Sequence, residues 1–161
     1  STILRFLDRG ILGILGPHVS TAERAQTLAD ACRYAPRGKR SFGSTRGANF
    51  AQYPSQAEYM EHRNSQILVM AQLEDVEVLQ DLDGILAVEG IDLFNSGPND
   101  IAQSMGLPGQ PKHPKVEEFE ARVSDAVHAV GKRMTSEVMA IVGSADLVLE
   151  GAAAFIEGAR D

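Results

Sequence analysis

The chain has 161 residues, with 15 Lys and Arg against 22 Asp and Glu, and a formal net charge of −7. This acidic balance argues against a nucleic-acid partner, which needs a basic face, and no apolar stretch is long enough for a membrane span. The single cysteine, Cys32, excludes an internal disulfide and a multi-cysteine zinc site, and predicts a reducing, cytoplasmic location. The length suits one domain over residues 1–161.

Short apolar runs alternate with segments of helical periodicity along the chain, which opens within a predicted helix. Three runs bounded by Gly, Pro or polar residues predict buried strands at residues 11–15, 67–73 and 91–95. Two further short strands are expected at residues 133–135 and 152–156. Strands that alternate with helices are typical of βαβ units, so the pattern predicts an α/β fold with a parallel sheet.

Helices are predicted between these strands. Ser20 or Thr21 can cap the first, in which apolar residues from Ala22 to Cys32 recur at i, i+3 and i+4 spacings. Cys32 lies on this apolar stripe, which favours a small core side chain over a reactive thiol. Three further helical segments are expected at residues 75–88, 113–130 and 137–149.

A long basic loop at residues 33–50 interrupts this alternation. It is Gly-rich, has no acidic residue, and contains five basic side chains: Arg33, Arg37, Lys39, Arg40 and Arg46. Its GKRSFGST segment is not a Walker phosphate loop, because the Lys precedes the second Gly. Either the loop guides an anionic substrate, or its arginines pair with acids across a subunit interface, and we favour the second interpretation.

Two carboxylates follow consecutive predicted strands. Glu74 ends the strand at residues 67–73, and Asp100 lies in the Gly-Pro-Asn-Asp turn after the next strand. Adjacent parallel strands bring their carboxyl ends to one edge, where α/β folds bind ligands. Two oxygen ligands suit Mg²⁺ or Mn²⁺ better than zinc. The alternative is structural: Asp100 caps its helix, and Glu74 is the first solvated residue after its strand.

Two more features lie near that edge. The turn at residues 97–100 opens a helix, so the main-chain N–H groups of Asn99 and Asp100 could hold a carboxylate. His18 follows the strand at residues 11–15 and could face the same edge, although a structural role is the simpler interpretation. The four histidines lack metal-ligand spacing, and no Ser or Cys has the surroundings of a nucleophile elbow.

At these residues the sequence resembles the HpcH/HpaI aldolase family, metal-dependent class II pyruvate aldolases related to citrate lyase β. The matching motifs occur in the family's order and spacing: GPHV and STAER at residues 16–24, RYAPRGKR at 33–40, QLE at 72–74, GPNDI at 97–101 and MG at 105–106. The resemblance implies a (β/α)8 TIM barrel, of which this chain covers roughly the C-terminal five βα units.

The resemblance also implies a site and a reaction. Glu74 and Asp100 match the family's ligands of a divalent cation (Mg²⁺, Mn²⁺ or Co²⁺), and Gln72, Asn99 and Asp100 match substrate-contacting positions, Asn99 through its main chain. The implied reaction is the reversible cleavage of a 4-hydroxy-2-oxo acid to pyruvate and an aldehyde. The implied partners are a small oxo acid and further copies of the chain, since the family forms hexamers.

The catalytic residues of the family are not matched here. Its general-base His and its Arg belong upstream of the matching segment, and His18 belongs to a different strand, so no catalytic residue is assigned. Two alternatives therefore stay open. One is a CoA-thioester lyase of the citrate or malyl-CoA lyase branch, in which the basic loop serves a CoA phosphate. The other is a catalytically incomplete fragment.

Overall fold

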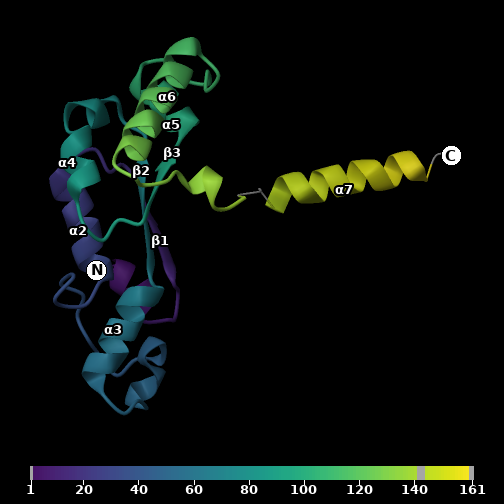
Figure 1. Cartoon of the computed structure of the whole chain (residues 1–161). Coiled ribbons are helices and arrows are strands. Elements are labelled where there is room, and N and C mark those ends of the chain that lie inside the picture. The colour runs from purple at the N-terminus through teal and green to yellow at the C-terminus, as the bar shows by residue number, and fades with distance from the viewer. Residues whose placement is uncertain (1, 141–143, 160–161) are drawn as a thin grey trace.

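A computed structural model of the chain describes residues 2–140 and 144–159. Strands β1 (Gly13–Gly16), β2 (Leu68–Leu73) and β3 (Leu93–Ser96) form one parallel sheet in the order β1-β2-β3, with β2 in the centre (Figure 1). The three strands predicted from the apolar runs are confirmed to within two residues at either end, but β1 and β2 are buried on one face only. The parallel sheet is confirmed as well.

The central strand β2 sets the core, because its side chains alternate between two environments. Val69, Ala71 and Leu73 are fully buried, whereas Leu68, Met70 and Gln72 on the opposite face are half-buried. Helix α2 (Ala22–Cys32) packs on β2 and on α4 (Leu82–Ala87). Burying one face of the sheet against helices is the arrangement expected of an α/β fold.

Helix α2 forms as its sequence predicts. Thr21 is its N-cap, and the Thr21 hydroxyl accepts a hydrogen bond from the Arg24 N–H at 3.2 Å. The apolar stripe is buried and includes Cys32, and burial raises the pKa of that thiol to about 11. Leu28 of α2 packs over Gly16 of β1: a Cβ at position 16 would lie 2.6 Å from a terminal methyl carbon of Leu28 and would displace that side chain.

The remaining helices vary in how well the sequence predicts them. Helix α6 agrees with the predicted helix at 113–130, although Val130 is exposed, and the segment 75–88 divides into a 3₁₀ helix and α4. Helix α3 was not predicted, because only Asn64 of its residues is buried and its apolar pattern is weak. The bounds are α1 (Thr2–Leu7), α3 (Gln56–Gln66), α5 (Pro98–Ser104), α6 (Pro114–Ala129) and α7 (Ser144–Gly158), with 3₁₀ helices at Arg46–Ala51, Val76–Gln80 and Thr135–Glu137.

The C-terminal predictions are largely wrong. The strand expected at 152–156 lies inside helix α7, whose Ala-rich sequence has high helix propensity. The helix expected at 137–149 is only partly present: a 3₁₀ helix (Thr135–Glu137) ends where it should begin, and residues 138–140 are not helical. Residues 141–143 lie outside the described residues, and residues 144–149 are helical as predicted, in α7. The strand expected at 133–135 is reduced to a parallel bridge between Met134 and Phe94.

Helix α7 is also the least covered element. None of its residues is buried, and Leu149 and Phe155 are among its exposed apolar side chains. Figure 1 shows it apart from the sheet and the other helices. Over the part of the chain that the structure describes, no helix combines the length and apolar character needed to cross a bilayer.

The basic loop at residues 33–50 is tied down within its own chain. Arg40 is buried, stacks 4.5 Å from the ring centroid of Tyr34 and pairs with Asp8 at 3.2 Å. The favoured interpretation, pairing across a subunit interface, is therefore wrong for the four basic residues with observed partners. These ion pairs are Arg33–Asp92, Arg37–Glu61, Lys39–Asp30 and Arg40–Asp8.

Candidate functional site

The candidate site is built around Glu74, which directly follows β2. Glu74 is only 1% exposed, although it is an ionisable residue at the end of a strand. The alternative that Glu74 is merely the first solvated residue after its strand is therefore wrong. A carboxylate buried this deeply needs hydrogen-bond partners or a cation, because removal from water disfavours its charged form.

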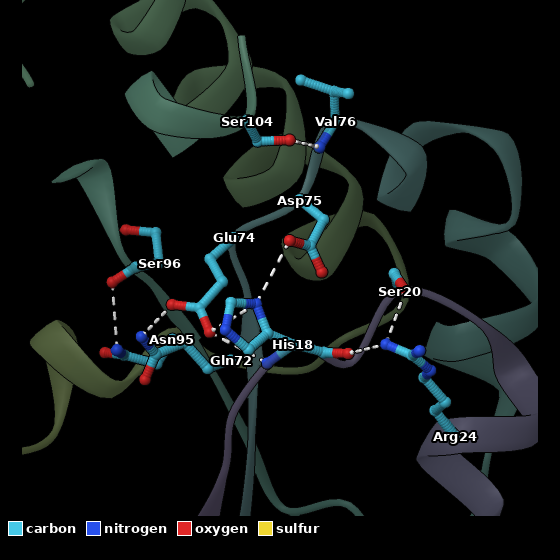
Figure 2. A network of polar contacts seen from close by, with 10 residues as sticks. All are labelled: His18, Ser20, Arg24, Gln72, Glu74, Asp75, Val76, Asn95, Ser96 and Ser104. Atoms are coloured by element: carbon cyan, nitrogen blue, oxygen red, sulfur yellow. Dashed lines mark hydrogen bonds and ion pairs between the residues drawn. The ribbon is translucent and has the colours of Figure 1, made fainter. Parts of the chain in front are cut away.

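The hydrogen bonds to Glu74 come from neighbouring residues on both sides (Figure 2). The main-chain N–H of His18 donates to Glu74 Oε1 at 2.9 Å, and the side-chain amide of Gln72 donates to Oε2. The imidazole Nδ1 of His18 lies 3.3 Å from Oε1. Two of these donors are neutral amides, so they orient the carboxylate without cancelling its charge.

A glycine lets the next βα unit approach this carboxylate. Gly97 is the N-cap of α5, and a Cβ at that position would lie 2.6 Å from Glu74 Oε2 and 2.8 Å from the amide nitrogen of Gln72. Any side chain there would push into both groups. The turn at residues 97–100 is therefore held directly against Glu74.

Asp100 lies in the first turn of α5 and is exposed, as is Asn99. The N-cap of this helix is Gly97 and has no side-chain cap hydrogen bond, so the alternative that Asp100 caps the helix is wrong. Because β2 and β3 are adjacent and parallel, Glu74 and this turn lie at the same edge of the sheet. The structure thus places all four predicted site residues, Gln72, Glu74, Asn99 and Asp100, at that edge.

His18 is the principal site neighbour that sequence reasoning underrated. Its Nδ1 lies 3.2 Å from Asp75 Oδ1, and its side chain is 55% exposed. The hydrogen bond with Asp75 and the negative charge of Glu74 raise the pKa of His18 above its usual value. The available signal was its place two residues beyond β1, since residues that follow parallel strands gather at one edge.

A second polar layer surrounds these residues (Figure 2). Asn95 pairs in register with Gln72 across β2 and β3, and its amide donates to the Ser96 carbonyl at 3.0 Å. The Ser104 hydroxyl accepts a hydrogen bond from the Val76 N–H at 3.0 Å, which ties α5 to the segment after Glu74.

The donor set fits a hard divalent cation. Glu74 offers a buried carboxylate with neutral amide donors, and Asp100 offers an exposed one at the same edge; oxygen ligands of this kind suit Mg²⁺ and Mn²⁺. Within residues 2–140 and 144–159, no cluster of three or more His, Cys, Asp or Glu side chains is arranged to hold a metal ion.

Comparisons with known proteins identify relatives of the chain. The chain is 40% identical over 128 residues to a hydroxypyruvate/pyruvate aldolase from Pseudomonas aeruginosa, covering 80% of this chain and 46% of that protein. It is 36% identical over 132 residues to a 4-hydroxy-2-oxovalerate aldolase from Rhodococcus jostii, covering 82% and 50%. The chain thus spans about half the length of the curated relatives it matches.

The fold has solved counterparts. The crystal structure of an HpcH/HpaI aldolase from Desulfitobacterium hafniense superposes with a TM-score of 0.75 at 31% identity, covering 93% of this chain and 57% of that one. Such relatives have an α/β fold of the TIM-barrel type, which agrees with the parallel sheet seen here. The family model described as HpcH/HpaI aldolase/citrate lyase matches residues 1–161, and the chain belongs to that family.

Proposed function

We propose that this chain is the metal-binding portion of a divalent-metal-dependent aldolase, a carbon–carbon lyase that cleaves a 4-hydroxy-2-oxo acid to pyruvate and an aldehyde. The observation that carries the proposal is the buried carboxylate of Glu74, held against the Gly97 turn that leads to Asp100. The names of the relatives support the reaction class, since two of them are a hydroxypyruvate/pyruvate aldolase and a 4-hydroxy-2-oxovalerate aldolase.

Glu74 and Asp100 would hold the cation, which is Mg²⁺, Mn²⁺ or Co²⁺ in this proposal. When bound, the cation supplies Lewis acidity towards the oxygens of an oxo acid. Gln72 orients Glu74 through its amide and contacts the pyruvate-like part of the substrate. Asn99 and Asp100 contact the same part, Asn99 through its main chain. The proton-transfer residues of the complete enzyme are not assigned to this chain.

We further propose that residues 1–161 form one part of a TIM barrel and correspond to roughly five βα units of it. The three parallel strands and the Phe94–Met134 bridge support this proposal, whereas the fifth expected segment, at residues 152–156, lies within helix α7. Assembly into a homo-oligomer and a cytoplasmic location complete the proposal. Light scattering of the purified protein tests the first, and microscopy of a tagged protein tests the second.

The CoA-lyase alternative is disfavoured by the basic loop. The side chains that it would use for a CoA phosphate are engaged with acids of the same chain, among them Arg37 with Glu61 and Lys39 with Asp30. Free CoA is therefore expected not to inhibit pyruvate release. Inhibition at low concentrations of CoA would favour the alternative.

The test of the proposal is a Mn²⁺ titration of the purified chain, combined with an assay for pyruvate release from 4-hydroxy-2-oxovalerate. Wild type should bind Mn²⁺ saturably, and Glu74→Gln should lose binding because the amide keeps the shape and removes the charge. Glu77→Gln, at an exposed residue three positions along, is the matched control and should bind as wild type. Retained binding in Glu74→Gln contradicts the metal assignment.

The activity assay separates the metal site from the reaction. Pyruvate release that requires Mn²⁺ and disappears in Glu74→Gln supports an aldolase active in this chain. Saturable Mn²⁺ binding without any pyruvate release makes the chain a catalytically incomplete portion, and the reaction then belongs to a longer protein.

A further inference from the structure

The turn that follows β1 is hydrogen-bonded through its main chain to the end of β2 and to helix α2. The His18 N–H donates to Glu74 Oε1 at 2.9 Å, and the next N–H, of Val19, donates to the Gln72 carbonyl at 3.0 Å. On the other side, Arg24 Nη1 donates to the His18 carbonyl at 2.9 Å. Residue 18 is therefore fixed at its N–H and at its carbonyl group.

This fixation requires an unusual backbone conformation. His18 has a φ of 52°, in the left-handed region that residues other than glycine seldom adopt. Such conformations persist where the surrounding structure holds them, and they concentrate at functional sites. Here the conformation lets the N–H reach Glu74 while the carbonyl faces Arg24 of α2.

The imidazole adds a second contact to the same carboxylate. Its Nδ1 lies 3.3 Å from Glu74 Oε1 and 3.2 Å from Asp75 Oδ1, so the ring bridges two consecutive acidic residues (Figure 2). Gln72 holds the other oxygen, Oε2. With both oxygens held, the Glu74 carboxylate cannot rotate without breaking hydrogen bonds on each side.

We propose that His18 is a positioning residue for Glu74, acting mainly through its main-chain N–H and secondarily through its imidazole. It fixes the carboxylate in the orientation that faces the turn at residues 97–100, and so sets the affinity of the site for a divalent cation. This inference rests on the proposed role of Glu74 as a metal ligand. Partners that orient a metal-binding side chain commonly change metal affinity about 10- to 100-fold when they are replaced.

The experiment compares two small residues at position 18. Glycine adopts a φ of 52° without cost and keeps the N–H in place, whereas alanine disfavours that conformation; both remove the imidazole. In a titration with Mn²⁺ alone, His18→Ala should weaken binding by about 10-fold or more, and His18→Gly should weaken it less. His62→Ala, at an exposed histidine of α3, is the control and should bind as wild type.

The outcomes separate this inference from the proposed function. If Glu74→Gln abolishes Mn²⁺ binding but His18→Ala binds with wild-type affinity, the positioning role is wrong and the metal assignment stands. If His18→Gly loses as much affinity as His18→Ala, the dominant role given to the main chain is wrong.

A metal-free measurement tests the contact itself. Amide hydrogen exchange of the wild-type chain without metal should show residue 18 strongly protected, because its N–H is bound to a buried carboxylate. This measurement needs no variant, so it decides the contact even if His18→Ala does not fold or Glu74→Gln still binds Mn²⁺. An amide at residue 18 that exchanges as fast as an unstructured peptide overturns the inference.

Discussion

A buried charged side chain lies at each end of β2, and the two side chains differ in their hydrogen-bond partners. Near the start of the strand, Arg33 is 4% exposed; just after its end, Glu74 is 1% exposed. The guanidinium of Arg33 makes five hydrogen bonds, one to the carboxylate of Asp92 and the others to main-chain carbonyl groups of Asn64, Ile67 and Gly90. Glu74 is held by main-chain and side-chain amides and by the exposed ring of His18.

The difference separates a structural charge, Arg33, from Glu74, which we propose binds a cation. A guanidinium has five N–H donors, and the five hydrogen bonds of Arg33 use that capacity, with Asp92 supplying the opposite charge. Glu74 is oriented by neutral amide donors at a sheet edge beside a glycine turn, and the imidazole next to it, of His18, is exposed and shared with Asp75. A buried charge with a full set of partners is costly to disrupt, whereas a carboxylate at a sheet edge can serve as an oxygen ligand of a cation.

The largest expected effect comes from removing the structural charge. Arg33→Met should destabilise the chain by several kcal/mol, because the buried main-chain carbonyl groups of Asn64 and Ile67 lose their donor. Each buried acceptor left unsatisfied costs about 1–3 kcal/mol, whereas Asp92 is exposed and returns to solvent. Urea denaturation followed by circular dichroism measures the change in the free energy of unfolding. Arg37→Met is the matched control, because Arg37 and Glu61 form an exposed ion pair at 2.8 Å worth less than about 1 kcal/mol. Equal effects of the two substitutions would remove the distinction between the pairs.

An intermediate effect is expected beside Glu74, at the end of β2. Gly97→Ala inserts a Cβ 2.6 Å from Glu74 Oε2, so it should cost about 1–3 kcal/mol of stability by overpacking and also weaken Mn²⁺ binding. Gly151→Ala is the control, because nothing lies within 4 Å of its Cβ position and it is inside helix α7. That substitution should leave Mn²⁺ binding unchanged and leave stability equal or higher by up to about 1 kcal/mol. Unimpaired Mn²⁺ binding in Gly97→Ala would contradict the close packing of the turn against Glu74.

The smallest effect is expected at the exposed ion pair between Lys39 and Asp30. Lys39 Nζ lies 2.5 Å from Asp30 Oδ2, and its hydrogen bond lowers the pKa of that carboxyl group below the usual value. A lowered carboxyl pKa adds stability above the unfolded pKa of about 3.9, and this is lost as the pH falls through the folded pKa. Lys39→Met should therefore cost less than about 1 kcal/mol at pH 7.

The pH dependence of the Lys39→Met effect is the control for this prediction. The difference between Lys39→Met and wild type, measured by urea denaturation across a pH series, should shrink once the pH falls below about 3.9. A difference that stays constant down to pH 2 would mean that the effect of Lys39 is not its charge.

Several parts of the fold followed from local patterns in the sequence. Strand β2 is predicted by an apolar run, and helix α2 by an apolar stripe that follows an N-cap residue. Both signals lie within a few consecutive residues of the chain. The same logic failed at residues 152–156, where an apolar run after a glycine suits a strand and a helix equally well. Helix α3 was missed because only one of its residues is buried.

The candidate site also has one part that the sequence predicts and one part that it does not. The pairing of Glu74 with the turn at Asp100 was predictable, because one βα unit separates them and parallel strands end at a common edge. The contact between His18 and Glu74 spans 56 residues and depends on a left-handed backbone at His18, which no local pattern announces. The ion-pair partners of the basic loop were also not predictable from local sequence, because these acidic residues lie up to 59 residues away in the chain.

The sequence by itself determined the α/β alternation, the family resemblance and the residue types at the sheet edge, because these depend on periodicity and short motifs. Only the tertiary structure decided which charges are buried and what surrounds them. Burial is a property of packing between distant segments, so Arg33 became a fully paired structural charge and Glu74 an oriented carboxylate only when β2 was enclosed by its neighbours.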